Sequence, residues 1–242
     1  MKQKKDLFMS SEEQHQMKLP EGVAIVPWDR NEFGMPIYEI HSVTTQVLKE
    51  IIHIPGHYTV KVDPLSSKRI LHEHGFYYCD TLVEPHCLQD HFVFHYDKAA
   101  NVTTDYLLDE LIAMCDGAFL YGRFHRDFNL TQQHANLRYI NWLRELDSEG
   151  CVFGLLYNGK AAGFIAFSSN RLVLHAVGEE YRGKGLAKYL WTTACKKMFE
   201  LGHNELVSSV SMGNLPVVNL YISLGFRLRN AVDVYHKIVE RK

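Results

Sequence analysis

Tyr181-Arg182-Gly183-Lys184-Gly185-Leu186-Ala187 is the stretch of sequence that decides the predicted fold. It lies between a predicted strand at 171–177 and a predicted helix at 186–200, which ends before Gly202. Because glycine lacks a Cβ, Gly183 and Gly185 let the backbone approach a ligand and turn several N–H groups into one concavity. The start of the helix adds unpaired N–H groups and a positive dipole end. The stretch therefore predicts a pyrophosphate-binding site.

Two other phosphate-binding patterns do not fit this stretch. GxxxxGK[ST] is absent, and the glycine spacing differs from GxGxxG. The alternative reading of the stretch is a plain strand-to-helix turn whose basic residues are solvated.

A second motif follows the next predicted strand, 205–211. It runs Asn214-Leu-Pro-Val-Val-Asn-Leu-Tyr221-Ile-Ser-Leu-Gly225-Phe226 and contains a predicted helix at 216–224 with proline in its first turn. With both motifs on the page, the sequence resembles the GNAT superfamily of acetyl-coenzyme A-dependent acetyltransferases.

The resemblance rests on two family patterns. The pyrophosphate pattern Arg/Gln-x-x-Gly-x-Gly/Ala is matched by Arg182, Gly185 and Ala187. The later pattern, Asn-x-x-Ala-x-x-x-Tyr-x-x-x-Gly-Phe, is matched by Asn214, Tyr221, Gly225 and Phe226. Two departures are mild: Val217 replaces the alanine, and Glu179 stands where proline is common before the loop.

The resemblance implies an α/β protein with the GNAT fold, a mixed and mostly antiparallel central sheet flanked by helices. We expect a flexible tail at 1–20, a small N-terminal α/β domain at 21–89 and the GNAT domain at 90–242. The implied cofactor is acetyl-coenzyme A. The candidate cofactor-binding residues are Leu174, Ala176, Val177, Arg182, Gly183, Lys184, Gly185, Leu186, Ala187, Asn214, Val217 and Tyr221.

The implied chemistry is direct attack of a neutral primary amine on the thioester. A backbone N–H of the strand 174–177 can meet the oxyanion. Tyr221 occupies the position of the general acid in many family members, and a tyrosine stays protonated to about pH 10. His175 is the candidate base because histidine titrates near neutrality; a water relay is the alternative. The plain alternatives are a core aromatic for Tyr221 and a packing residue for His175.

A narrower resemblance concerns the acceptor. Ser211-Met212-Gly213-Asn214 and Tyr221-Ile222-x-x-Gly225 resemble the N-acetyltransferases of dTDP-4-amino-4,6-dideoxygalactose, which also carry a small α/β domain before the core. Weaker matches are Trp28, Phe33-Gly34, His74-Gly75-Phe76 and Phe119 with Arg123-Phe124. This resemblance implies a nucleotide-linked amino sugar as substrate.

The candidate substrate-binding residues lie in one loop. Arginine and histidine suit a diphosphate, and aromatic rings suit a base or sugar. The candidates are Tyr121, Arg123, Phe124, His125 and Arg126. The plain alternative is a solvated charged loop after a helix.

Two other functions compete with this one. A GNAT enzyme acting on a protein N-terminus, a lysine or a small amine would share the core. A non-catalytic acyl-coenzyme A-binding module, or a nucleotide-binding regulator, would share only the fold.

The composition of the chain narrows the expected partners and cellular location. The 242 residues include 46% hydrophobic and 22% charged residues, and a net charge of −2 does not favour nucleic acid as a partner. No run of about 18 apolar residues exists, so no membrane is expected. Five scattered cysteines favour a reduced, cytoplasmic setting. The groups His72-Glu73-His74 and His86, His91 and His95 lack a zinc-site pattern, so no metal is expected. A homodimer is left open.

The remaining expected elements come from periodicity and turn residues. Strands are expected at 23–26, 37–40, 58–62, 76–83, 90–96, 151–157, 160–168 and 232–238. Helices are expected at 44–52, 68–74, 106–119 with a cap at Thr103 or Thr104, and 133–146 with a cap at Thr131. The segment 121–130 is expected to be irregular, and Asn158-Gly159 predicts a type I′ hairpin turn.

Overall fold

The computed structural model describes residues 19–26 and 35–240. The chain divides into two compact units: Met1–Cys79 with Val234–Lys242, and Asp80–Asp233. Strands β4 (Tyr77–Leu88) and β11 (Arg227–Val239) contribute residues to both units. The predicted domain boundary between residues 89 and 90 stays a prediction. Most of the predicted tail at 1–20 lies outside the described residues.

The first unit is a small α/β unit. Strands β1 (Val23–Ile25), β2 (Ile37–Ile40) and β3 (Gly56–Val62) are consecutive, and β3 neighbours β11. The β2–β3 pair is parallel, because the chain crosses over through helix α3 (Thr45–Ile51) between the two strands. Thr44 caps α3 by accepting a hydrogen bond from the Val47 N–H. Helix α4 (Arg69–Glu73) completes the unit.

The second unit holds a sheet in the order β11-β4-β9-β8-β7-β6-β5. Its other strands are β5 (Ala100–Thr103), β6 (Val152–Tyr157), β7 (Lys160–Ser168), β8 (Arg171–Val177) and β9 (Glu205–Ser208). The pairs β4–β9, β5–β6, β6–β7 and β7–β8 are antiparallel, and β8–β9 is parallel. A short strand, β10 (Val210–Ser211), pairs with β4. The predicted mixed, mostly antiparallel sheet is confirmed.

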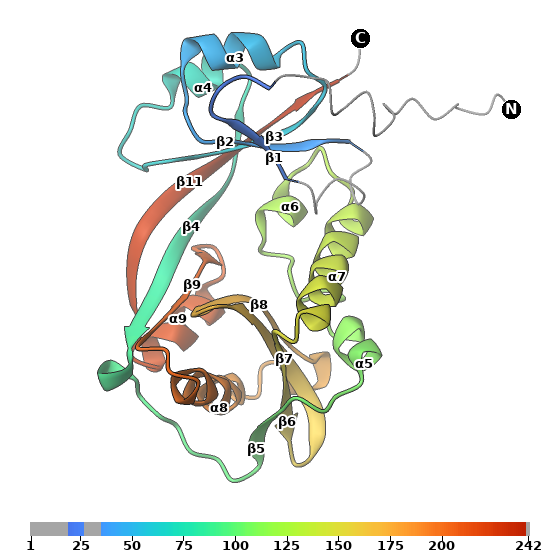
Figure 1. Ribbon diagram of the computed structural model, residues 1–242, viewed down its shortest axis with the longest axis vertical. Coiled ribbons are helices and arrows are strands. Elements are labelled where there is room, and N and C mark those ends of the chain that lie inside the picture. Colours follow the sequence, from blue (N-terminus) through green and yellow to red (C-terminus); the bar gives the residue numbers. More distant parts are fainter. Residues whose placement is uncertain (1–18, 27–34, 241–242) are drawn as a thin grey trace, which may run out of the picture. The chain divides into compact units, whose positions relative to one another are not determined.

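Helices cover both faces of this sheet (Figure 1). Helices α8 (Ala187–Glu200) and α9 (Leu215–Ser223) pack on one face, where Trp191 and Met198 join a buried cluster with the strands. Helices α5 (Leu108–Ala113) and α7 (Gln132–Ser148) pack on the other face, with Leu111 and Leu143 fully buried. Helix α6 (Arg123–Arg126) is a single turn, and two 3-10 turns lie at Gln89–His91 and Glu179–Tyr181.

Local sequence signals explain several boundaries. The side chain of Thr131 accepts from the His134 N–H and begins α7, as expected. Asn158 and Gly159 have φ values of 52° and 75°, which a type I′ turn requires, and they join β6 to β7. None of the helices in the described part of the chain is long and apolar enough to cross a membrane.

Three expected elements were wrong. Residues 90–96, expected to be a strand, form the end of a 3-10 turn and an extended segment. The Val93 N–H bonds to the Leu224 carbonyl and not to a neighbouring strand, and β5 is the edge strand of the sheet. The helix expected at 106–119 covers only Leu108–Ala113, and the Thr103 hydroxyl accepts from the Asp105 N–H instead of capping the helix. The segment 121–130, expected to be irregular, contains α6.

Candidate functional site

The cavity of the second unit opens where two parallel strands part. Strands β8 and β9 pair only at Arg171 with Val207 and Leu172 with Ser208, after which β9 ends. The cavity beside the rest of β8 has a volume of about 780 Å³ and is lined by residues 171–177 of that strand. The parting of the strands also leaves backbone groups of β8 without a partner strand on this side.

A β-bulge in β8 decides which side chains face which helices. Leu174 pairs with Ala166 and Leu172 with Phe167, so Val173 is an extra residue. The extra residue shifts the alternation of side chains by one position. Leu172 therefore packs in the α8 cluster, whereas Leu174 packs in the α7 cluster. His175 lies on the α8 side, with its ring centroid 5.1 Å from that of Trp191.

The loop at 182–187 has the form of an anion cradle. Gly183 and Gly185 have φ values of 72° and 71°, and a Cβ built on either would have no atom within 4 Å. In the described part of the chain, the N–H groups of residues 183–188 donate to no backbone carbonyl; the first bonds of α8 are made by Tyr189 and Leu190. These free donors, together with the start of α8, fit the diphosphate of coenzyme A.

Arg182 and Lys184 play different parts from the glycines. The guanidinium of Arg182 lines the cavity and donates to the carbonyl oxygens of Val177 at 2.8 Å, Met114 at 3.3 Å and Asp116 at 3.5 Å. Its visible role is therefore to hold the loop against its neighbours. Lys184 is exposed and is not among the cavity-lining residues.

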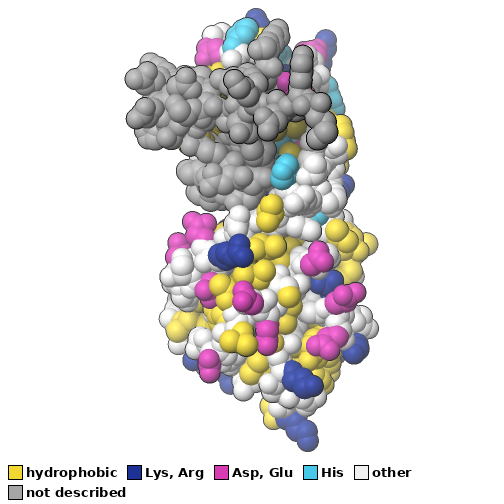
Figure 2. Space-filling view, turned by 90° about the vertical axis from the view of Figure 1, so that its right-hand side faces the viewer, with side chains coloured by type: hydrophobic (Ala, Val, Ile, Leu, Met, Phe, Trp, Pro, Cys, Tyr) yellow, Lys and Arg dark blue, Asp and Glu magenta, His cyan; other side chains and the backbone are white. Residues whose placement is uncertain are grey.

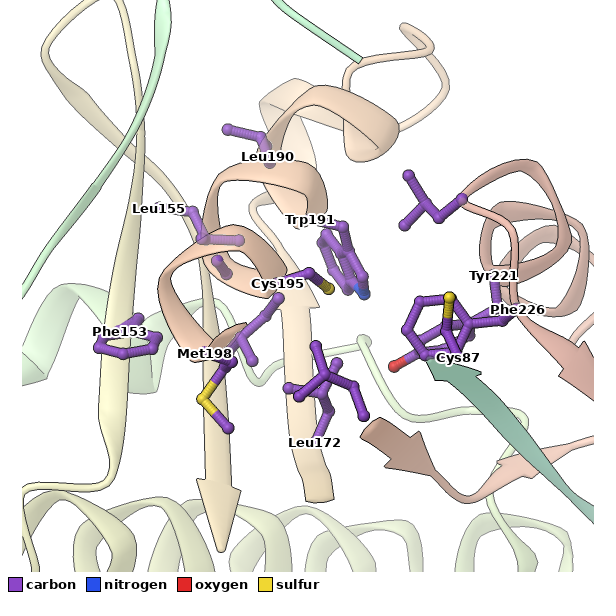
Figure 3. Close-up of a cluster of buried hydrophobic side chains, with 14 of the residues drawn as sticks. Cys87, Phe153, Leu155, Leu172, Leu190, Trp191, Cys195, Met198, Tyr221 and Phe226 are labelled. Carbon is purple, nitrogen blue, oxygen red and sulfur yellow. The ribbon is translucent and has the colours of Figure 1, made fainter. Parts of the chain in front are cut away.

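Tyr221 and His175, the two predicted catalytic residues, are in contact. The Tyr221 hydroxyl lies 3.1 Å from Nε2 of His175. Tyr221 is fully buried and is not itself among the cavity-lining residues, whereas His175 lines the cavity. Figure 3 shows the Tyr221 ring beside Phe226, with its hydroxyl directed towards Trp191 and Leu172.

Burial disfavours the charged form of both residues. It raises the pKa of Tyr221 and lowers the pKa of His175 to about 4. His175 is therefore neutral at pH 7, and its Nε2 can accept the Tyr221 proton if Nδ1 carries the ring hydrogen. A group with so low a pKa is a weak base, so the contact favours His175 as a partner that orients Tyr221.

The second motif forms the start of α9. Asn214 caps the helix by accepting from the Val217 N–H at 3.4 Å, and both residues line the cavity. Leu174, Ala176, Val177, Leu186 and Ala187 also line it. The structure thus brings all the predicted cofactor-binding residues except Lys184 and Tyr221 to the cavity wall. Their roles stay predictions.

The predicted substrate loop is split between cavity and core. Tyr121 and Arg123 line the cavity. Phe124 is 2% exposed and lies under a guanidinium of α7, and Nε2 of His125 lies 2.7 Å from Asn136. Burial also lowers the pKa of His125. Arg126 donates to Asp80 and does not line the cavity. The one-turn helix α6 causes the split by turning successive side chains in different directions.

Sequence reasoning missed an aromatic wall on the α7 side of the cavity. Its members are Phe119, Tyr139 and Trp142, with Arg138 among them. Phe119 and Tyr139 stack with ring centroids 4.2 Å apart, and the Arg138 guanidinium lies 5.2 Å from the Trp142 ring. The spacing of Arg138, Tyr139 and Trp142 on one predicted helix face was the available signal. Asp80, also in the wall, had no sequence signal, whereas Ser211 belongs to the quoted segment Ser211–Asn214.

The surface on the α5–α7 side mixes residue types. Figure 2 shows hydrophobic side chains gathered among interspersed acidic and basic ones on this face. The interspersed charges agree with a net charge of −2.

One family of known proteins matches part of the chain. Residues 117–226 match the Acetyltransferase (GNAT) family. No curated protein shows significant similarity to the chain.

Solved structures with low sequence identity share the fold. A GCN5-related N-acetyltransferase from Sphaerobacter thermophilus has a TM-score of 0.62 at 12% identity, covering 90% of this chain and 76% of its own. A conserved protein of unknown function from Staphylococcus epidermidis has a TM-score of 0.60 at 13% identity, covering 92% and 93%. A GCN5-related N-acetyltransferase from Kribbella flavida has a TM-score of 0.54 at 10% identity, covering 84% and 81%.

The matched residues include the glycine loop, the β8 bulge and the helix that carries Tyr221. The loop geometry suits the diphosphate of the donor that this family uses. Residues 117–226 therefore form a GNAT acetyltransferase domain, and the protein is an acetyl-coenzyme A-dependent N-acetyltransferase.

Proposed function

We propose that the protein transfers the acetyl group of acetyl-coenzyme A to the amine of a nucleotide-linked amino sugar. The composition of the cavity wall supports this substrate class most directly. Four arginines line the cavity, at positions 123, 138, 171 and 182, against one acid, Asp80. Arg171 pairs with Glu84 at 2.7 Å and Arg182 holds the glycine loop, so Arg123 and Arg138 are the two that support an anionic substrate. One guanidinium group can donate two parallel hydrogen bonds to a phosphate group. A polyamine or aminoglycoside would instead require several carboxylates in the cavity.

The aromatic wall supplies the second argument. Tyr121 and Trp142 offer ring faces near Arg123 and Arg138 on the side of the sheet away from α8, while Tyr139 is stacked between Phe119 and His125. A nucleotide base or sugar ring packs on such faces, while the arginines suit its diphosphate. The donor's diphosphate belongs at the other side, where the glycine loop leads into α8. Donor and acceptor would thus enter from opposite faces.

The reaction follows from the groups at the parted strands. The free N–H groups at 183–188 hold the donor's diphosphate, and the backbone of β8 beyond Leu172 binds the arm that carries the thioester. A β8 N–H stabilises the oxyanion as the amine attacks. The Tyr221 hydroxyl, oriented by His175, is the proton source for the leaving thiolate.

A narrower acceptor is compatible with the same site. The segment Ser211–Asn214, which resembles the acetyltransferases of dTDP-4-amino-4,6-dideoxygalactose, contributes Ser211 and Asn214 to the cavity wall. The small α/β unit before the core also fits that resemblance. Trp28, Phe33 and Gly34 lie outside the described residues and add no structural support. A cytoplasmic location agrees with the five cysteines, all of which are free thiols.

The test is release of free thiol from acetyl-coenzyme A with a panel of amines. The panel holds nucleotide-linked 3- and 4-amino sugars, amino acids, polyamines and short peptides. Turnover confined to the nucleotide-linked sugars is expected. An Arg138→Gln variant should then raise KM for the sugar and leave the affinity for acetyl-coenzyme A unchanged. Turnover only with peptides or polyamines would discard the sugar assignment.

A further inference from the structure

Asp80 is a buried carboxylate in the wall of the acetyltransfer cavity. It lies on β4, two residues before Leu82, whose partner on β10 is Ser211. The residue is 0% exposed and lines the cavity. It is the one acid among the lining residues of the described chain, so its presence among four arginines requires an explanation.

The two oxygens of this carboxylate have different surroundings. Oδ1 accepts three hydrogen bonds, from Arg126 Nη1 at 2.8 Å, Ser211 Oγ at 2.7 Å and the Thr81 N–H at 2.9 Å. Oδ2 is buried and has no hydrogen-bond partner in the described part of the chain. The three donors fix the orientation of the group, and a buried acceptor without a donor is costly. Oδ2 is therefore a preformed acceptor for a ligand's N–H.

The end of β8 nearest Asp80 indicates which ligand reaches this carboxylate. The glycine loop is tied to the Val177 end of β8, through the bond from Arg182. The other end, at Leu172, pairs with Ser208, three residues before Ser211. Six residue steps of a strand separate Arg171 from Val177, roughly 20 Å at about 3.3 Å per residue. A donor whose diphosphate is held by the loop extends its thioester towards the Asp80 end, where the acceptor amine must arrive.

The charges around Asp80 suit a group that gains and loses a proton. Burial raises its pKa above the ordinary carboxyl value, while Ser211 and Arg126, with Arg123 further away, act in the opposite direction. Asp233 is nearby through the Thr81 hydroxyl, which donates to it at 2.7 Å. A raised pKa makes a carboxylate a better proton acceptor. His175, whose Nε2 faces Tyr221, is the weaker candidate.

We propose that Oδ2 of Asp80 binds the ammonium group of the acceptor and takes the proton that must leave before the amine attacks. The inference rests on the proposed transfer to a primary amine and names the residue that recognises that amine. One ammonium proton passes to Asp80 and then to water. The nitrogen lone pair forms the N–C bond, and the C–S bond breaks. The nitrogen then loses a second proton, and the departing thiolate gains one. The products are the amide, coenzyme A thiol and one proton.

The test compares Asp80→Asn with Asp147→Asn on the acceptor that the wild type turns over fastest in the amine panel. Asp147 is a matched control because it accepts one hydrogen bond, from the Tyr106 hydroxyl at 2.7 Å, and does not line the cavity. Asp80→Asn should lower kcat/KM for the amine at least 100-fold, the usual scale of general base catalysis. Its affinity for acetyl-coenzyme A should stay within about twofold of the wild type. Asp147→Asn should match the wild type in both.

The pH profile separates this role from a structural one. With an ionised Asp80 and a protonated amine as reactants, wild-type kcat/KM should rise with pH through the pKa of Asp80 and fall as free ammonium is lost. Without the carboxylate, Asp80→Asn must use the neutral amine. Its profile should instead rise steadily to the pKa of the amine. Arg126→Gln, which removes a cation that lowers the pKa of Asp80, should move the acidic limb to higher pH.

Each outcome decides between the two proposals. Unchanged kcat/KM and an unchanged acidic limb in Asp80→Asn would overturn the role of Asp80 and leave the amino-sugar assignment intact. A hundredfold loss on a peptide or polyamine would support Asp80 and discard the sugar. If Asp80→Asn does not fold, an acidic limb that stays in place in Arg126→Gln overturns the inference.

Discussion

Two glycine-to-alanine variants separate backbone strain from donor binding. Gly185 lies in the loop that lines the cavity, and Gly159 lies in the β6–β7 hairpin. Their φ values are 71° and 75°, and a Cβ on either would meet no atom within 4 Å. Alanine therefore introduces the same left-handed strain at both positions, without a clash. Only at Gly185 would the methyl group stand beside N–H groups that are free to bind an anion.

The stability cost should be equal at the two positions. A residue with a Cβ in the left-handed region costs about 1–2 kcal/mol. For a protein of this size, each kcal/mol corresponds to a fall in Tm of roughly 2–4 °C. Both variants should thus unfold at a slightly lower temperature than the wild type, by similar amounts.

The affinity for acetyl-coenzyme A should change in one variant alone. A hydrogen bond to a charged group contributes about 1.5–3 kcal/mol, so loss of one phosphate contact raises Kd roughly 10- to 100-fold. This increase is expected for Gly185→Ala. Gly159→Ala should bind the donor as the wild type does.

Calorimetric titration with acetyl-coenzyme A and urea unfolding of both variants provide the measurements. Equal stability loss with unequal Kd is the expected pattern. If Gly185→Ala and Gly159→Ala have the same Kd, the diphosphate is not held by the 182–187 loop. If Gly185→Ala loses far more stability than Gly159→Ala, the assumption of equal strain fails.

Three further outcomes are expected. Tyr221→Phe should lower kcat at least about tenfold with little change in donor affinity, because it removes the hydroxyl that contacts Nε2 of His175. Stopped-flow or steady-state turnover at saturating donor measures kcat. Unchanged turnover would show that Tyr221 is not the acid. The pKa of His175 is about 4 in the folded protein against 6.5 for the free group, so the unfolded chain binds more protons between these values and stability falls as the pH drops through that window. Between pH 7 and pH 4.5 the loss should be about 2 kcal/mol, and urea unfolding at these two pH values should show a smaller difference for His175→Gln. Thr131→Ala and Asn214→Ala should each lower the free energy of unfolding by about 1 kcal/mol, because each removes a helix cap. Asn214→Asp should retain most of the wild-type stability. Equal stability of Asn214→Ala and the wild type would contradict the capping role.

Local signals carried much of the fold prediction. Strands β7 and β8 have the expected bounds, and α7 begins at the expected cap. These features depend on residues within a few positions of one another, such as Asn158-Gly159 in its turn. The segment 90–96 failed for the same reason. Its alternation of aromatic and polar residues suits a strand, but a strand also needs a partner, and the backbone of Val93 bonds to the end of α9.

The candidate substrate loop shows a second limit. The sequence groups Tyr121, Arg123, Phe124, His125 and Arg126 within six positions, and proximity in sequence suggested a common role. The turn of α6 sends Phe124 and His125 into the core and leaves Tyr121 and Arg123 at the cavity. A one-turn helix is too short for a periodicity that would reveal which side chains are buried.

The sequence by itself determined the parts of the site that the backbone makes locally. The positive φ of Gly183 and Gly185, the free N–H groups at the start of α8 and the cap at Asn214 follow from residues that are adjacent in the chain. The tertiary structure alone decided the contacts between distant segments. Asp80 meets Ser211 across 131 positions, and His175 meets Tyr221 across 46. Strand pairing and the bulge at Val173 set those contacts, because one residue more or less in a strand moves every later side chain to the other face.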